Sequence, residues 1–326
     1  MSKLVTIFGG SGFVGRYVAR RMALQGWRVK VATRRPNEAM FVKPYGVVGQ
    51  VEPVLCNIRD ENSVAAALRG ADAVVNCVGI RNETGANSFE AVHVDGAERV
   101  ARLAAEAGVA RFVHLSALGI DRDSASKFAS SKARGEEAVL RHRPDAVILR
   151  PSAVFGTEDH LFNDLAALTR LGPVLPMPCL GTRFQPVYVD DLAKAAVSGV
   201  LGTADGIYEL GGPEVVTLGE MVNQMLDVIH RKRVVMNMPR FMARIIAFGL
   251  DMTQKMSFGM ITNAILTRDQ LRGLATDHVV SEGAKGFGDL GIAPVAMGTI
   301  LPDYLWRFRP SGQYDAIKQS AGNLRS

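Results

Sequence analysis

The stretch Leu4-Val5-Thr6-Ile7-Phe8-Gly9-Gly10-Ser11-Gly12-Phe13-Val14-Gly15 decides the fold of this chain, because an apolar run ends in glycines just where a helical pattern begins. Glycines at 9, 12 and 15 permit a tight turn, let the backbone approach a pyrophosphate and let the helix lie close to the strand. The following helix N-terminus favours negative charge. We interpret the stretch as a nucleotide-binding loop rather than a connector without a ligand. The expected contacts are Gly9, Ser11, Gly12, Phe13, Val14 and Gly15.

The first 150 residues alternate short strand-like runs with longer helical stretches, which is the pattern of a parallel sheet with crossover helices. The strand-like runs lack polar alternation, as expected when helices cover both faces of a sheet. We expect strands at 4–8, 28–33, 52–55, 73–77, 111–115 and 146–149, and helices at 13–25, 62–68, 91–107 and 126–141. The sequence therefore predicts an α/β fold with a Rossmann-like, doubly wound parallel sheet.

The regularity fades after residue 150, where Gly172-Pro173, Pro176 and Pro178 indicate loops. A helix at 189–201 and a strand at 206–210 are expected to return the chain to the first sheet. We predict an NAD(P)-binding domain over 1–212, with about 157–185 contributing to a smaller domain. That smaller docking domain spans 213–326 and ends in a loose tail from about residue 311.

Composition places the chain among ordinary globular proteins, with 48% hydrophobic and 21% charged residues in 326. Its three cysteines form no C-x-x-C pair, so neither a disulfide framework nor a metal site is expected, and a reducing compartment is the default. We expect no signal peptide and no membrane span, since no apolar run reaches the roughly 20 residues that a span needs. A net charge of +6 indicates an acidic partner, an anionic membrane surface or a phosphorylated ligand, with an ordinary solvated surface as the alternative, and we recognise no nucleic-acid module.

The end of the second strand indicates which nucleotide binds. An acidic residue usually holds the 2′-hydroxyl of NAD there, whereas this chain has Thr33, Arg34 and Arg35. Guanidinium groups bind phosphate bidentately, so the pattern favours NADPH over the alternative of two ordinary surface arginines. Two further segments follow strand ends, where open α/β sheets bind ligands. They contribute Asn57 and Ile58, and Cys77, Val78 and Gly79.

Phe128 begins the stretch Phe128-Ala-Ser-Ser-Lys132, which is one hydroxyl short of a Tyr-x-x-x-Lys active site. A phenol can pass a proton to a substrate oxygen, but a phenyl ring has no exchangeable proton. Tyr188 is the nearest alternative donor by motif. We therefore expect no catalytic residue in a degenerate site of Ser116, Phe128 and Lys132.

These pieces resemble the extended, atypical branch of the short-chain dehydrogenase/reductase superfamily. The resemblance rests on the glycine motif, 76–79, Ser116, Lys132, Arg150-Pro151-Ser152-x-x-Phe155-Gly156 and Pro186-Val187-Tyr188-Val189-Asp190-Asp191. It implies that Ser116 orients a substrate and that Lys132 holds the nicotinamide ribose. It also implies cofactor contacts from Pro151 and Val154.

The region 230–266 holds a basic cluster, 230–233, and six of the thirteen methionines. Phe241, Ile245, Phe248 and Met252 share one helical face, with Arg240 and Arg244 beside it. Such a segment suits a membrane surface or a groove on a partner. The alternative is a helix packed on its own domain, with methionine filling gaps.

Four C-terminal strings resemble the bacterial form of the nucleotide-binding accessory subunit of respiratory complex I. They are 266–271, 277–281, 289–292 and Tyr304-Leu305-Trp306-Arg307-Phe308-Arg309-Pro310. This resemblance implies a tightly held, structural NADPH and neighbouring subunits of the peripheral arm near the quinone-binding region. It implies a peripheral location on the cytoplasmic face of the inner membrane. The alternative is a free-standing NADPH-dependent reductase or epimerase-like enzyme.

Overall fold

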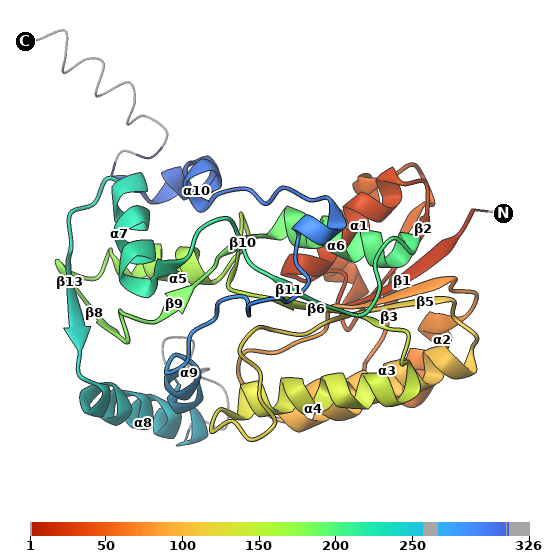
Figure 1. Cartoon of the computed structure of the whole chain (residues 1–326), viewed down its shortest axis with the longest axis horizontal. Coiled ribbons are helices and arrows are strands. Elements are labelled where there is room, and N and C mark those ends of the chain that lie inside the picture. Colours follow the sequence, from red (N-terminus) through yellow and green to blue (C-terminus); the bar gives the residue numbers. More distant parts are fainter. Residues whose placement is uncertain (1, 257–266, 311, 313–326) are drawn as a thin grey trace, which may run out of the picture.

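Seven parallel strands form the central sheet, in the order β11-β6-β5-β4-β1-β2-β3 (Figure 1). The computed structural model describes residues 2–256, 267–310 and 312. The strands are β1 Leu4–Phe8, β2 Arg28–Thr33, β3 Val51–Leu55, β4 Ala73–Asn76, β5 Arg111–Leu115, β6 Val147–Pro151 and β11 Ile207–Leu210. The predicted α/β class and doubly wound sheet are confirmed, and 206–210 returns to the sheet beside β6 as expected.

Helices cover both faces of this sheet (Figure 1). One layer holds α1 Phe13–Leu24 and α6 Val189–Leu201, with the 3-10 segment η1 Pro36–Tyr45 packed beside α1. The other holds α2 Glu61–Leu68, α3 Asp95–Glu106 and α4 Lys127–His142. Successive side chains of a strand alternate between the layers, so Ile7 joins the core under α1 while Phe8 joins the core under α3. β1 pairs with both β2 and β4, which makes its carboxyl end the switch point of the sheet.

The expected helix over 91–107 begins differently from the prediction. A π-helical turn, η2 Glu90–Val94, precedes α3. It buries His93, whose ring is hydrogen bonded on both sides, to Ile80 and to Ser131. These tertiary contacts favour the wider turn, which hydrophobic periodicity alone does not reveal.

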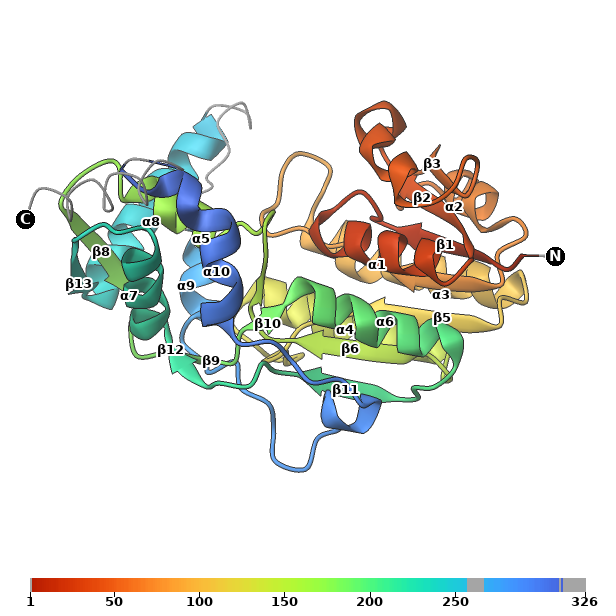
Figure 2. The same cartoon turned by 90° about the horizontal axis from the view of Figure 1, so that it is seen from above.

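A second core lies beyond the carboxyl ends of the strands (Figure 2). It joins α5 Leu161–Leu168, α7 Leu218–Val228 and α10 Met297–Leu305 around buried residues such as Phe162, Met221 and Leu301. Its short strands are β7 Val154–Phe155, β8 Val174–Pro178, β9 Arg183–Phe184, β10 Val187–Tyr188, β12 Val216–Thr217 and β13 Val234–Met238. The interpretation of Pro176 and Pro178 as loop residues was wrong, because β8 pairs with β13 in a two-stranded sheet, where every strand is an edge that tolerates proline.

Two further helices of the described residues are α8 Arg240–Met256 and α9 Arg268–Gly273. Two short 3-10 turns are η3 Gly288–Leu290 and η4 Trp306–Phe308. Phe287 packs in the first core, and the Glu209 N–H donates to the Lys285 carbonyl, so part of the C-terminal third lies against the first sheet. The domain boundary at 212/213 stays a prediction. The expected tail from 311 lies almost entirely outside the described residues. Within the described ranges, no helix combines the length and apolarity that crossing a membrane requires.

Candidate nucleotide-binding site

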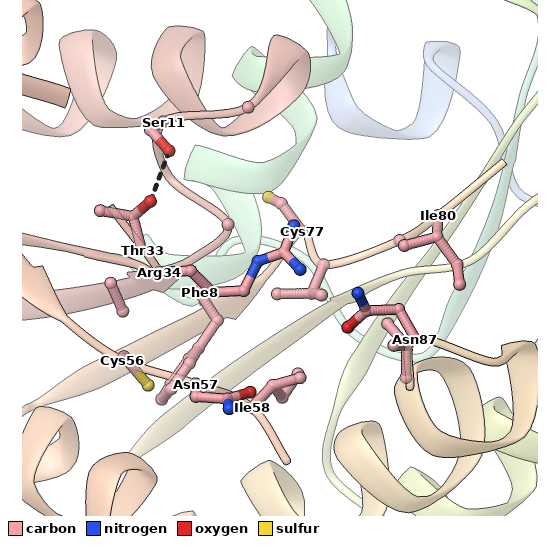
Figure 3. Close-up of a pocket in the computed structure, with 16 residues that line it drawn as sticks. Phe8, Ser11, Thr33, Arg34, Cys56, Asn57, Ile58, Cys77, Ile80 and Asn87 are labelled. Atoms are coloured by element: carbon pink, nitrogen blue, oxygen red, sulfur yellow. Dashed lines mark hydrogen bonds between the residues drawn. The ribbon is translucent and has the colours of Figure 1, made fainter. Parts of the chain in front are cut away.

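A cavity of about 220 Å³ lies at the carboxyl ends of β1 to β4 (Figure 3). Its wall combines the glycine loop, the ends of β2 and β3, and the segment that follows β4. The lining residues are Phe8, Gly9, Ser11, Gly12, Ala32, Thr33, Arg34, Cys56, Asn57, Ile58, Cys77, Val78, Gly79, Ile80, Asn87 and Val92. Open α/β sheets bind their ligands at this place, next to the switch point.

The glycine loop has the close approach that its sequence predicts. Gly9 has φ +72°, a left-handed conformation that favours glycine, and its N–H donates to the Ala32 carbonyl at 3.0 Å. A Cβ on Gly15 would lie 2.3 Å from the Gly9 carbonyl oxygen, so α1 can rest on the loop only because residue 15 has no side chain. Gly12 precedes α1 without a side-chain cap, which leaves first-turn N–H groups available to an anion.

The two predicted arginines lie in different environments. Arg34 lines the cavity, and Figure 3 shows its side chain crossing it. The Arg35 side chain is 76% exposed and pairs with Glu38 at 3.2 Å, outside the lining. Thr33 also lines the cavity and accepts a hydrogen bond from Ser11 Oγ at 2.9 Å, which ties the glycine loop to the end of β2.

Both predicted segments at strand ends reach the cavity, as do residues that the motif-based prediction did not include. Asn57, Ile58, Cys77, Val78 and Gly79 are in the wall. Phe8 is the last residue of β1, Ala32 is the last but one of β2, and Cys56 directly follows β3, so the rule about strand ends could have found them. Ile80, Asn87 and Val92 come from the long segment after β4, for which the sequence carries no comparable signal.

The degenerate site lies beside this cavity on α4 and the end of β5. Lys132 is buried, and its ammonium donates to the Leu115 carbonyl at 3.0 Å. A Cβ on Gly79 would lie 3.5 Å from Lys132 Nζ, which places the ammonium next to the cavity wall. Ser116 Oγ is one of the few buried side-chain polar atoms in the described chain that lack a hydrogen-bond partner. Such an atom fits a site that a ligand completes.

Phe128 lies one turn before Lys132, where the motif would place a phenol. Its ring meets Phe89 and His93 edge to face, with centroids 5.9 and 5.5 Å away. Tyr188, the alternative donor, is not in the cavity wall, and its ring lies against Phe155 of the second core. The arrangement therefore offers a cation and a hydroxyl to a ligand but no phenol beside them.

Burial controls the charges around α4. Desolvation lowers the pKa of Lys132 to about 8, and desolvation together with the nearby charge of Lys132 lowers the pKa of His93 to about 2. Burial also raises the pKa of the Cys77 thiol to about 12. The neutral His93 ring accepts from the Ile80 N–H at 3.0 Å through Nε2, and its Nδ1–H donates to Ser131 Oγ at 2.9 Å. Lys132 is thus the cation of this group, and His93 is a neutral structural link.

The remaining predicted contacts lie outside the cavity wall. Phe13 and Val14 begin α1, with Val14 against the first core. Pro151 ends β6 beside Leu210, and Val154 opens β7. Their roles as cofactor contacts stay predictions, as do those of all the other predicted site residues, including the ones in the cavity wall.

Comparison with known proteins gives consistent matches over nearly the whole chain. A family model described as the NAD dependent epimerase/dehydratase family matches residues 5–211. The Arabidopsis thaliana protein named NADH dehydrogenase (ubiquinone) 1 alpha subcomplex subunit 9, mitochondrial, is 35% identical over 316 residues, or 95% of this chain and 79% of that protein. The mitochondrial 40 kDa subunit of NADH-ubiquinone oxidoreductase from Neurospora crassa is 32% identical over 317 residues, covering 95% and 80%.

Solved structures agree on the fold. The NADPH-dependent quinone oxidoreductase QOR2 of Escherichia coli, determined with NADPH, superposes with a TM-score of 0.69 over 92% of this chain and 98% of that one, at 15% identity. Such low identity carries the fold alone, whereas the two subunits above are similar in sequence over nearly the full length. The chain therefore belongs to the NAD dependent epimerase/dehydratase family and, within it, to the family of these NADH:ubiquinone oxidoreductase subunits.

Proposed function

We propose that this chain is a non-catalytic accessory subunit of NADH:ubiquinone oxidoreductase that holds NADPH as a structural element. The observation that carries the proposal is Phe128, which occupies the turn before Lys132 where a reductase needs a proton donor. General acid–base catalysis contributes about 10²- to 10⁴-fold, so its loss leaves a binding site rather than an efficient enzyme. The relatives that match 95% of this chain are named as subunits of NADH:ubiquinone oxidoreductase, and we assign the chain to the same assembly.

The residues of the cavity fit the parts of NADPH. The open N–H groups after Gly12 suit the pyrophosphate, and the Arg34 guanidinium suits the 2′-phosphate that distinguishes NADPH from NADH. Lys132 and the unpartnered Ser116 hydroxyl suit the hydroxyls and amide at the other end of the nucleotide. NADPH itself supplies hydride chemistry, whereas these side chains bind and orient it. Because a ligand that binds only the folded state stabilises it, the nucleotide would act as a staple for the fold.

Helix α8 supplies a surface for docking. Phe241, Ile245, Phe248 and Met252 are 44% to 66% exposed, so much of this face is open in the described structure. Arg240 and Arg244 are exposed beside it. We assign α8 to contact with the membrane surface next to the peripheral arm, because an apolar face flanked by arginines suits an anionic lipid interface. The subunit would then be peripheral, on the cytoplasmic face of a bacterial inner membrane.

Isolation of the native protein from membranes in mild detergent tests this function. The protein should co-purify with the iron–sulfur subunits, and NADPH should be released only by denaturation. A monomer that turns over exchangeable NADPH reproducibly would instead support the alternative, a free-standing reductase or epimerase-like enzyme. Quantifying both NADPH and NADH in the denatured extract checks the nucleotide separately from the assembly.

A further inference from the structure

The N-terminus of α4 is capped by a carboxylate from another helix. The first turn of α4 contains no acidic residue of its own, although negative charge there stabilises a helix. Asp269 of α9 supplies it, because its carboxylate accepts from the Lys127 N–H at 2.6 Å, the Phe128 N–H at 3.0 Å and the Ser126 hydroxyl at 3.0 Å. Three donors of one helix turn therefore converge on a side chain about 140 residues further along the chain.

The same turn of α4 is joined to the nucleotide cavity. The Ser131 hydroxyl donates to the Phe128 carbonyl at 2.9 Å and accepts from His93 Nδ1. The other ring nitrogen of His93, Nε2, accepts from the backbone N–H of Ile80, which lines the cavity. Lys132 follows directly on the helix and reaches the Leu115 carbonyl. A shift of the first turn of α4 would thus move both Lys132 and the wall around Ile80.

On its other side, α9 is joined to α8. Leu271 of α9 packs with Ala243 and Ala247, the buried small face of α8. Arg268 pairs with Asp251 at 3.0 Å, and its guanidinium lies 5.2 Å from the centre of the Phe248 ring. Figure 1 shows α9 between α8 and the end of α4. The helix with the exposed apolar face is therefore connected through α9 to the nucleotide site.

We propose that Asp269 is a positioning residue that couples α8 to the nucleotide site, so that NADPH binding orders α9 and α8, and docking of α8 strengthens retention of NADPH. The coupling is reciprocal because both events favour the same arrangement of α4 and α9. The proposal rests on the proposed binding of NADPH in the cavity. It assigns to α4 the role of a connecting element in place of a catalytic one.

Hydrogen exchange of the full-length protein, with and without NADPH, tests the coupling. In the wild type, NADPH should slow exchange in the glycine loop and also in α9 and the described part of α8, the latter by roughly tenfold. Asp269→Ala should keep the effect at the loop and reduce it at α9 and α8 to less than about threefold, and NADPH should dissociate roughly ten times faster. Asp269→Asn retains one acceptor oxygen and should lie between, and it also serves if the alanine variant does not fold.

Thr217→Ala is the matched control, because it removes a helix cap from α7 that does not lie between α8 and the cavity. It should leave the effect of NADPH on α9 and α8 unchanged. The coupling is refuted if NADPH protects the glycine loop of the wild type but not α9, or if Asp269→Ala retains the full protection. Absence of protection at the glycine loop itself would instead contradict the proposed nucleotide site.

Discussion

Replacement of Gly15 by alanine tests whether the contact between α1 and the glycine loop holds the nucleotide site in shape. The new Cβ would lie 2.3 Å from the Gly9 carbonyl oxygen and 2.6 Å from Gly10 Cα. Both neighbours are backbone atoms, so relief requires α1 and the loop to separate by about 1 Å, and overpacking of this kind costs about 1–3 kcal/mol. For a chain of 326 residues, the upper half of that range corresponds to a fall of roughly 3–5 °C in Tm.

The same displacement moves the α1 N–H groups away from their ligand, so Gly15→Ala should also lose NADPH. Gly249→Ala is the matched control, since a Cβ there meets nothing within 4 Å and the position is inside α8. It should raise stability by about 0.5–1 kcal/mol through helix propensity. Thermal unfolding of nucleotide-free protein and nucleotide content after denaturation measure the two effects separately. The reasoning fails if Gly15→Ala keeps both its Tm and its NADPH, or if both alanine variants are destabilised equally.

Three further predictions address charge, the missing hydroxyl and pH. Arg34→Glu should weaken NADPH binding about 100-fold and NADH binding far less. Arg35→Glu should change the binding of either nucleotide little, because the Arg35 side chain is exposed and paired with Glu38. Titration calorimetry with both nucleotides measures these affinities, and equal losses of NADPH and NADH binding in Arg34→Glu would contradict the assignment of Arg34 to the 2′-phosphate. Phe128→Tyr should leave nucleotide content and assembly intact, as measured by reconstitution into membranes that lack the subunit; failure to assemble would show that the apolar ring itself is needed. Burial lowers the pKa of His93 to about 2 and that of His114 to about 3. The unfolded chain therefore binds more protons than the folded one below about pH 6.5, and the free energy of unfolding decreases as the pH falls, by up to about 2.7 kcal/mol per pH unit for the pair. Urea midpoints that do not decline between about pH 7.5 and 5.5 would count against this prediction.

The central sheet was predictable because its information is local. Apolar runs bounded by glycine-rich turns identify buried parallel strands, and three of them, Leu4–Phe8, Arg28–Thr33 and Arg111–Leu115, coincide with the observed bounds. The second core was not predictable in the same way. Its strands are short and partly proline-containing, and β8 is recognisable as a strand only from its pairing with β13, about 60 residues later.

In the candidate site, too, the residues with a local sequence signal were predictable and those placed by tertiary contacts were not. Gly9, Arg34, Asn57 and Cys77 could be placed because strand ends of a parallel sheet converge on one edge. Sequence alone does not show which of the two adjacent arginines lines the cavity, because this depends on the direction of the backbone after β2. In the structure, Arg34 lines the cavity and Arg35 is exposed. Nor does sequence alone show the wall after β4, which tertiary hydrogen bonds hold in place.

The contacts around residue 128 join the first turn of α4 to its neighbours. Here the backbone N–H of Phe128 is held by Asp269, and its ring packs against Phe89 and His93. Both contacts make the turn more rigid and join it to α9, which suits a helix that transmits an interaction. Retention of Lys132 without the phenol is then consistent, because the ammonium can bind a ribose without any proton leaving the site.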